Sequence, residues 1–297
     1  MQVVSQVTVL FLLMALGYLA ARGRILNKSA FEGINKLVLF FTLPCLTFAK
    51  LQHEAAPGQM VELLETFLLA TVFMLLCLAV GFLYTRGQPE KRRAVFLNMA
   101  MFSNCGFMGY PVIIAAFGED KLIYAVMYSA SFNLLTWTAG VYLYAGRAGL
   151  SLKKLVFNPT LISVVLGFLC FGLAIRVPKI PLDAMTLLGD TTTPLAMVII
   201  GGLLVGLKLS DIRDGMLLLS CLMRLIVFPL AVLGILLALR VPRGVLEGVF
   251  ACTAMPASTA TAMQAEFFKG DGPLASRGVA LSTALSVITI PLMLQLV

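Results

Sequence analysis

Two stretches of the chain decide its fold, FSNCGFMGYPV at residues 102–112 and ACTAMPASTATAMQAE at residues 251–266. Each lies within a long apolar run and interrupts it with glycine, proline or small polar residues. Glycine and proline break the helical hydrogen-bond ladder. Backbone groups freed at membrane depth are tolerated only beside protein or a water-filled cavity. The two stretches therefore predict two helices that are broken near their centres, inside a membrane protein.

The composition supports a membrane location. Of the 297 residues, 60% are hydrophobic and 12% are charged, whereas soluble domains have roughly 45–50% apolar and about 25% charged residues. This charge content is too low to cover a soluble surface, which excludes a soluble enzyme. The single histidine, His53, excludes most histidine-based metal sites, and the six cysteines lie in apolar stretches without a CxxC pair. We expect free thiols, no metal site and no cofactor.

The apolar runs predict an all-α protein. A bilayer core needs about 20 apolar residues per helix, and membrane strands alternate in polarity over about ten residues, which these runs do not. The predicted spans are residues 3–21, 30–51, 61–85, 93–117, 122–145, 157–176, 182–206, 215–239, 244–268 and 275–297.

The basic residues predict the orientation of these ten spans. Fourteen Lys and Arg fall in the loops of one side, against six on the other. Because cytoplasmic loops collect Lys and Arg, we expect the richer side to be cytoplasmic and both termini to be non-cytoplasmic, in a bacterial inner (plasma) membrane. The net charge of +8 is then explained by the basic residues of the cytoplasmic loops, and no nucleic-acid partner is expected. The fourteen residues are Arg22, Arg24, Lys28, Arg86, Lys91, Arg92, Arg93, Arg147, Lys153, Lys154, Lys208, Arg213, Lys269 and Arg277.

The chain also shows signs of an internal repeat, residues 1–148 and 149–297. Pro44 and Pro194 lie 150 residues apart, each in the second span of its half, and AAFGED (115–120) is matched by EFFKGD (266–271). Because each half has an odd number of spans, the second copy is inverted in the membrane. Interrupted helices at matching positions of inverted repeats indicate the binding site of a transporter.

The interrupted spans supply the candidate substrate-binding groups. The N-terminal ends of the second half-helices, expected near Gly109–Pro111 and Pro256–Ser258, carry free N–H groups and partial positive charge. The amide of Asn104 can donate to a carboxylate. The predicted substrate-binding residues are Asn104, Gly106, Gly109, Pro111, Pro256, Ser258, Thr259, Thr261 and Arg224, and the predicted helix-break positions are Pro44 and Pro194.

Charged and polar residues inside other spans have two interpretations each. Arg224 either attracts the substrate anion or caps the carbonyls of a broken helix, since a charge at mid-membrane is costly and faces the interior. Asp190 either couples transport to an ion or has a structural place, as a cap of the half-helix that begins near Pro194 or as a residue of a water-filled outer vestibule. Glu266, with Gln264 beside it, either couples or gates transport or is an interfacial acid.

Five fragments in order resemble the auxin efflux carrier family, which includes the plant auxin carriers and short bacterial-type members. They are GINKLVLFFTLPCLTF (33–48), NCGFMGYP (104–111), MRLIVFPL (223–230), AMPASTATAMQAEF (254–267) and LSTALSVITIPL (281–292). The resemblance covers nearly the whole chain. It implies ten helices in two inverted five-helix repeats whose broken fourth and ninth helices cross, a fold like that of bile-acid sodium symporters and of sodium/proton antiporters of the NhaA type.

The resemblance also implies a mechanism and a substrate class. Helices 1, 2, 6 and 7 would form a scaffold, which can dimerise, and helices 3–5 and 8–10 a transport core that moves as an elevator. Members carry small organic anions, either malate- or malonate-like carboxylates or auxin. The plant carriers often join helices 5 and 6 by a long hydrophilic loop, whereas the connection from Tyr144 to Asn158 is short here, so auxin itself is not implied.

The alternatives to a secondary transporter are an anion channel and an intramembrane enzyme. An anion channel also uses broken helices, but crossed interruptions in inverted repeats favour alternating access. An intramembrane serine or metalloprotease needs a membrane histidine, and an aspartyl protease needs two membrane aspartates, of which Asp190 is one and no second is present. We therefore expect no enzyme activity. The sequence leaves open the substrate, the direction of transport and whether H⁺ or Na⁺ is the coupling ion.

Overall fold

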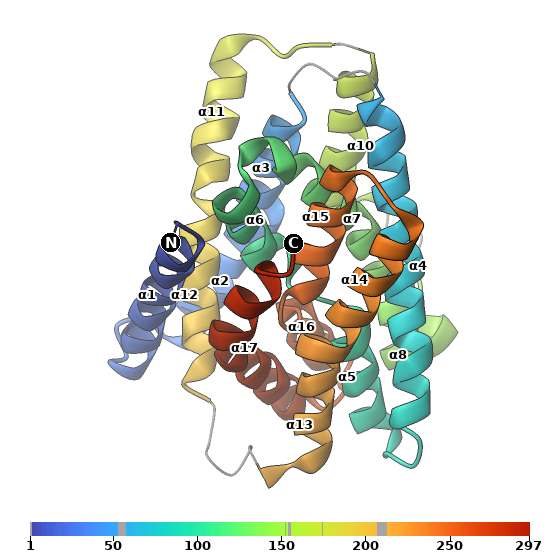
Figure 1. Cartoon of the computed structure of the whole chain (residues 1–297). Helices are drawn as coiled ribbons and strands as arrows, with labels where there is room; N and C mark the ends of the chain where they lie inside the picture. The colour runs from blue at the N-terminus through green and yellow to red at the C-terminus, as the bar shows by residue number, and fades with distance from the viewer. Residues whose placement is uncertain (1, 53–57, 152, 154–155, 174, 207–212) are drawn as a thin grey trace.

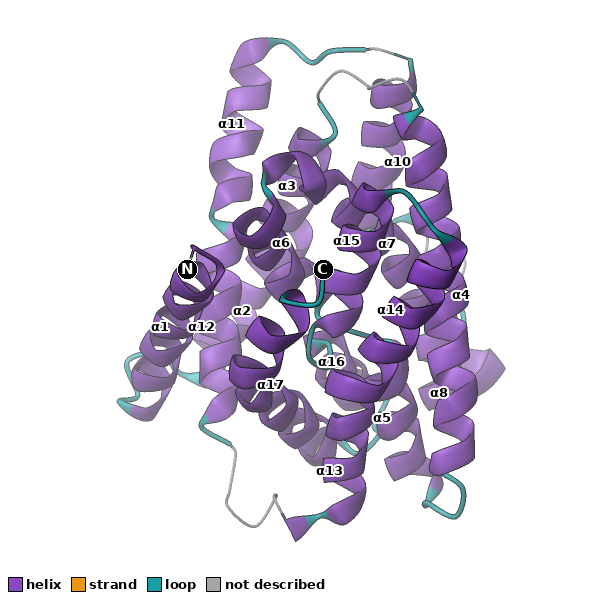
Figure 2. Cartoon of the chain, in the orientation of Figure 1, coloured by secondary structure: helices purple, strands orange, loops and turns teal. Residues whose placement is uncertain are grey.

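The computed structural model describes residues 2–52, 58–151, 153, 156–173, 175–206 and 213–297. This part of the chain is helical almost throughout and contains no strand beyond one isolated β-bridge, so the predicted all-α class is confirmed (Figure 2). His53 lies outside the described residues. All six cysteines are described and are free thiols, as expected.

The helices follow the predicted apolar runs closely. In the first half they are α1 (Gln2–Arg22), α2 (Lys28–Leu37), η1 (Val38–Thr42), α3 (Leu43–Lys50), α4 (Gln59–Tyr84), α5 (Glu90–Met101), η2 (Cys105–Gly109), α6 (Tyr110–Phe117), η3 (Glu119–Lys121), α7 (Leu122–Leu135), η4 (Thr136–Gly140), α8 (Val141–Ala145) and η5 (Gly146–Gly149). In the second half they are α10 (Pro159–Gly172), α11 (Lys179–Asp190), α12 (Thr192–Leu204), α13 (Gly215–Leu222), η7 (Met223–Val227), α14 (Phe228–Leu239), α15 (Arg243–Ala254), α16 (Thr259–Phe267) and α17 (Gly272–Leu294).

Within the described residues, five helical segments are long and apolar enough to cross a membrane. They are Ser29–Lys50, Gln59–Tyr84, Lys179–Leu204, Gly215–Leu239 and Gly272–Leu294. The two interrupted stretches give shorter helices, because each break divides one apolar run into two parts. The count of ten membrane crossings stays a prediction.

The tightest helix packing joins α1 to α12, which lie side by side in Figure 1. A Cβ atom built on Gly17 would lie 2.1 Å from the carbonyl oxygen of Val198, and one on Gly201 would lie 1.9 Å from that of Met14. Because both distances are far below van der Waals contact, only glycine permits this approach. Small residues at helix crossings allow such backbone contact in membrane proteins.

The two predicted helix-break prolines occupy different settings. Pro44 lies in the first turn of α3, and α2, η1 and α3 run on without a gap, so the helix widens into a π-helical turn rather than ending. Pro194 lies in the first turn of α12, just after the junction with α11 at Thr191. Near these prolines Thr192 Oγ1 donates to Thr42 Oγ1 over 2.9 Å, which joins two residues 150 positions apart.

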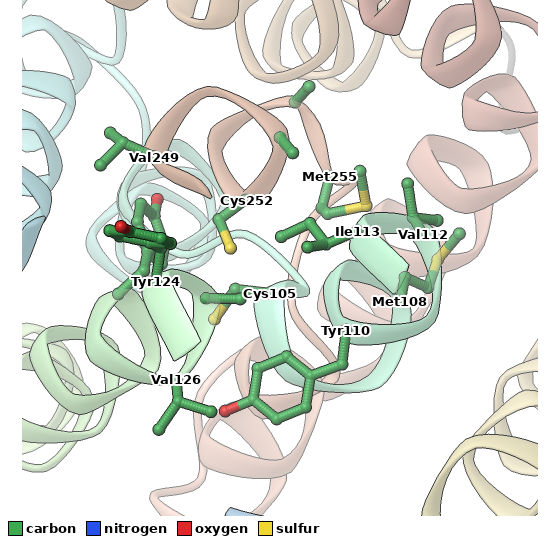
Figure 3. Close-up of a cluster of buried hydrophobic side chains, with 14 of the residues drawn as sticks. Cys105, Met108, Tyr110, Val112, Ile113, Tyr124, Val126, Val249, Cys252 and Met255 are labelled. Carbon is green, nitrogen blue, oxygen red and sulfur yellow. The ribbon is translucent and has the colours of Figure 1, made fainter. Parts of the chain in front are cut away.

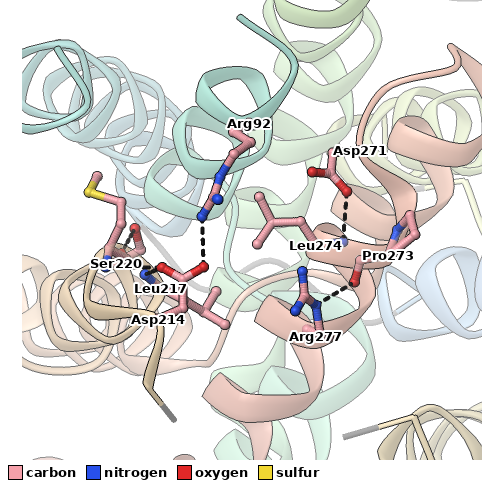
Figure 4. Close-up of polar contacts among 9 residues, drawn as sticks. Arg92, Asp214, Leu217, Ser220, Asp271, Pro273, Leu274 and Arg277 are labelled. Atoms are coloured by element: carbon pink, nitrogen blue, oxygen red, sulfur yellow. Dashed lines mark hydrogen bonds and ion pairs between the residues drawn. The ribbon is translucent and has the colours of Figure 1, made fainter. Parts of the chain in front are cut away.

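Two aspartates begin helices at one end of the molecule (Figure 4). Asp214 Oδ1 accepts from Leu217 N at 3.2 Å and Asp271 Oδ1 accepts from Leu274 N at 3.0 Å, so each caps the first turn of its helix. Asp214 also pairs with Arg92 at 2.6 Å. This pair ties the start of α5 to the start of α13, far apart in sequence.

Candidate functional site

The two sequence breaks meet in space. In Figure 1, α5 and α16 occupy the lower half of the molecule, and α6 and α15 the upper half. The chain leaves α5 and α15 in extended form, and the two extended segments form an antiparallel bridge between Ser103 and Ala257. The two broken helices therefore touch at their interruptions.

Backbone hydrogen bonds hold the two breaks together. Asn104 N donates to Pro256 O at 2.8 Å, and Ser258 N donates to Phe102 O at 3.0 Å. Each break thus satisfies backbone groups that the other leaves unpaired, which is the requirement for irregular backbone at membrane depth. Pro256 contributes its carbonyl to this pairing rather than a side chain to the cavity described below.

The second half-helices begin beside the crossing. η2 starts at Cys105, directly after Asn104 and earlier than the predicted Gly109–Pro111, because a π-helix carries the chain through the glycines. α16 starts at Thr259 and is capped by Ser258, whose Oγ accepts from the N–H of Ala260 at 3.1 Å. Both helix N-termini lie at the crossing and place partial positive charge there.

A cavity of about 580 Å³ lies against the crossing, within the range of roughly 300–1,000 Å³ found for small-molecule sites. Five of the predicted site residues line it, namely Asn104, Gly106, Ser258, Thr259 and Gln264. The other lining residues are Leu39, Phe40, Leu43, Cys105, Phe107, Tyr110, Ser129, Phe132, Asn133, Thr136, Trp137, Lys153, Phe157, Asn158, Pro159, Thr160, Ala260, Met263, Phe267 and Phe268.

Four polar atoms on this lining are buried and have no hydrogen-bond partner within the described part of the chain. They are Asn104 Nδ2, Tyr110 Oη, Thr136 Oγ1 and Gln264 Oε1. Asn104 is only 3% exposed and Gln264 6%. A buried polar group without a partner costs about 1–3 kcal/mol, so these atoms are suited to bonds with an occupant of the cavity. Lys153 is the only charged residue among the described lining residues.

One side of the cavity comes from the fifth predicted span, whose polar residues the sequence analysis did not single out. Ser129, Asn133 and Thr136 follow one another at spacings of four and three residues and all line the cavity. Residues at this spacing share one face of a helix. A polar face on a helix that is otherwise apolar was therefore the signal that identifies these residues. Tyr110, just after the glycines of η2, carried no such signal.

Arg224 lies behind the crossing and outside the cavity lining. It is 1% exposed, its Nη1 donates to Ala100 O at 3.0 Å, and its Nη2 donates to Thr253 O. These carbonyls belong to the last turns of α5 and α15. One guanidinium thus holds the C-terminal ends of both first half-helices, the placement expected for a cap on broken helices. A contribution of Arg224 to anion affinity stays a prediction.

The remaining predicted residues lie away from the lining. Asp190, the last residue of α11, and Glu266, on α16, are both exposed. The N-cap position of α12 is Thr191, and its side chain makes no cap hydrogen bond. Thr261 is buried within α16. The ion-coupling or gating roles of Asp190 and Glu266 stay predictions.

Gly109 packs against the other broken helix, whose Cys252 and Met255 are labelled in Figure 3. A Cβ on Gly109 would lie 3.6 Å from Met255 Cγ and 3.7 Å from Cys252 Sγ. Pro111 is buried in the first turn of α6. Gly109 therefore packs at the crossing, and neither residue lines the cavity. No group of three or more His, Cys, Asp or Glu among the described residues is placed to hold a metal ion.

Comparison with known proteins agrees with this arrangement. The family model described as membrane transport protein matches residues 2–152 and 147–294. The chain belongs to the membrane transport protein family. The resemblance to auxin efflux carriers agrees with this membership, and the match favours a transporter over an intramembrane enzyme.

Two archaeal relatives extend over almost the same length as this membrane transport protein. An uncharacterized transporter of Methanocaldococcus jannaschii is 24% identical over 302 residues, which cover 96% of this chain and 96% of the relative. An uncharacterized transporter of Methanothermobacter thermautotrophicus is 27% identical over 296 residues, covering 94% and 93%. Together with the apolar helices, these matches identify a multi-pass membrane transporter.

Proposed function

We propose that the protein is a secondary transporter that binds a small organic anion, a carboxylate, in the cavity at the crossing of its broken helices. The observation that carries this proposal is the set of unpartnered donors on the lining. Asn104 Nδ2 and Thr136 Oγ1 are buried and have no hydrogen-bond partner within the described residues. A carboxylate presents acceptors only, so it complements these groups.

The charge of the cavity favours an anion. Lys153 is its only charged lining residue among those described, and the N-termini of η2 and α16 add partial positive charge at the crossing. The wall is otherwise mainly apolar and aromatic, with Phe107, Phe132 and Trp137 among its residues. This lining suits a single carboxylate with an apolar body better than a dicarboxylate, whose second charge would lie against apolar surface.

Contacts between corresponding positions support two inverted repeats. At the crossing, the N–H of Asn104 donates to the carbonyl of Pro256, and the N–H of Ser258 donates to the carbonyl of Phe102. Asn104 and Ser258 therefore occupy equivalent positions in the two breaks. The hydrogen bond between Thr42 and Thr192 joins two residues that are 150 positions apart in the sequence. Pro44 and Pro194, the corresponding prolines of the two halves, have the same sequence separation. Both contacts fit a two-fold axis in the membrane plane.

The repeats support alternating access of the elevator type. We assign α1–α3 and α10–α12 to a scaffold and the remaining helices to a transport core, with a homodimer formed through the scaffold. The close glycine contacts of α1 with α12 favour a rigid scaffold. The exposed residues Lys153 and Phe157 line the cavity, so it reaches the end that the charge distribution assigns to the cytoplasm.

The test is ligand binding by the purified protein. Organic acids that bind the folded state raise its apparent melting temperature, and a panel of mono- and dicarboxylates is screened at two pH values with and without Na⁺. Hydrogen bonds to charged groups contribute about 1.5–3 kcal/mol, so Asn104→Ala should weaken binding of any stabilising acid at least about tenfold. It should reduce uptake into proteoliposomes in parallel.

The control is Asn98→Ala. Asn98 is buried on α5, six residues before Asn104. Its Nδ2 donates to Ala94 O at 3.1 Å, and it does not line the cavity. Wild-type affinity in a folded Asn104→Ala protein would contradict the proposed site. Uptake that saturates and shows counterflow identifies a carrier, whereas an ion conductance would identify a channel.

A further inference from the structure

The side-chain amide of Gln264 has a fixed orientation. Its Nε2 donates to Thr136 O at 2.7 Å. That carbonyl also accepts from the N–H of Val141, so both of its lone pairs are used. Because only the nitrogen of the amide can donate, the oxygen Oε1 must point elsewhere. Gln264 lines the cavity, and its Oε1 is buried and accepts no hydrogen bond within the described residues.

The amide of Gln264 packs against Gly140, where a side chain would collide with it. A Cβ built on Gly140 would lie 2.9 Å from Gln264 Oε1 and 3.0 Å from Phe102 Cε2. Gly140 ends η4, the π-helix that begins with Thr136. The absence of a side chain at Gly140 therefore lets the amide lie against this turn with its oxygen free.

The lining donors near the crossing do not satisfy this acceptor. Asn104 Nδ2 and Thr136 Oγ1 are themselves buried and form no hydrogen bond with any described residue. The cavity thus holds an unpaired acceptor besides its donors. A ligand that packs against Gln264 and offers only C–H groups would leave this buried oxygen unsatisfied.

We propose that Gln264 selects organic acids that carry a hydrogen-bond donor, a hydroxyl or N–H, in addition to the carboxylate. This inference rests on the proposed function, since it concerns the same cavity and the same anion. Asn104 and the helix N-termini receive the carboxylate, and Gln264 Oε1 receives the donor. Sites built to bond a substrate hydroxyl reject the analogue that lacks it far more strongly than apolar pockets reject a missing methylene.

The experiment compares acids in matched pairs that differ by one donor. Mandelate and phenylacetate share their charge and ring, and differ by a hydroxyl. Lactate and propionate form a second pair, and 4-hydroxyphenylacetate and phenylacetate form a third. Dissociation constants are measured for the purified full chain by thermal shift and calorimetry. We expect the donor-bearing member to bind about tenfold or more tightly in at least one pair.

Two variants assign the selection to Gln264. Gln264→Met keeps the length of the side chain but removes the acceptor, and should bring the two members of that pair within about twofold of each other. Gly140→Ala keeps Gln264 but displaces its amide oxygen, and should reduce the preference in the same direction. The matched control is Gln295→Met, an exposed residue after α17 that does not line the cavity, which should keep the wild-type preference.

The outcomes separate this inference from the proposed function. If both members of every pair bind the wild type equally, or if a folded Gln264→Met or Gly140→Ala protein keeps the full preference, selection by Gln264 is wrong while the anion site stands. If no acid of the panel binds the wild type, the anion site fails, and the selection fails with it.

Discussion

The role of Arg224 can be tested by removing its guanidinium. Arg224→Met leaves the carbonyl oxygens of Ala100 and Thr253 without their charged donor, in surroundings where both residues are at most 2% exposed. Two hydrogen bonds to a charged group contribute about 3–6 kcal/mol together. Release of the buried charge offsets part of this loss. We therefore expect the free energy of unfolding to fall by about 3–5 kcal/mol.

The assay is thermal or chemical unfolding in detergent. At roughly 2 °C per kcal/mol for a chain of this size, the melting temperature should fall by about 6–10 °C. Arg224→Lys keeps the positive charge on a single ammonium group, and its melting temperature should fall by about half as much. The control Arg86→Met changes an arginine that is exposed in the turn after α4, and should alter stability by no more than about 0.5 kcal/mol.

The result that refutes the clamp is a melting temperature of Arg224→Met equal to that of the wild type. A second readout separates the two interpretations of this residue. If Arg224 only holds the ends of α5 and α15, a folded Arg224→Lys protein binds the acids that stabilise the wild type with unchanged affinity. If their affinity falls more than about tenfold in a variant that keeps the charge and the fold, Arg224 also takes part in anion recognition.

Two further predictions concern the packing between the halves. Gly201→Ala places a methyl group 1.9 Å from Met14 O and should lower the free energy of unfolding by about 1–3 kcal/mol or more. The control is Gly234→Ala, which should not lower it because a Cβ there meets nothing within 4 Å. Equal unfolding curves of the two variants would contradict the close α1–α12 contact. Thr192→Val removes the donor to Thr42 and should lower the free energy of unfolding by about 1 kcal/mol. A double-mutant cycle with Thr42→Val should show a favourable coupling between the two hydroxyls. Strictly additive effects on stability would mean that the hydroxyls do not interact.

Several parts of the fold and site were predictable because they depend on local chemistry. Long apolar runs form helices wherever backbone groups must be satisfied without water, so the helix boundaries fall near the predicted spans. Glycine and proline marked the breaks near Asn104 and Pro256, and the polar character of Asn104, Ser258 and Gln264 marked lining residues. The spacing of Ser129, Asn133 and Thr136 on one helix face held the same information and was not used.

Other parts were decided by contacts between distant segments. The second half-helix starts at Cys105, before the glycines, because the chain there forms a π-helix. The extended segment just before this π-helix is paired with the extended segment that follows α15. Arg224 had two interpretations in the sequence, since both an anion and a pair of carbonyls can receive a guanidinium. Only the approach of Ala100 and Thr253 to its nitrogens shows which groups it contacts.

The sequence by itself determined that this chain is an all-helical membrane protein with two interrupted helices, since low charge, apolar run length and glycine–proline content act through local physics. The tertiary structure alone decided that the breaks pair at Ser103 and Ala257 and that a cavity lies beside them. It also decided that Asn104, Thr136 and Gln264 line this cavity and that each has a buried atom without a partner among the described residues. The physical reason is that hydrogen-bond satisfaction of a buried group depends on its spatial neighbours, which residue spacing within one helix does not specify.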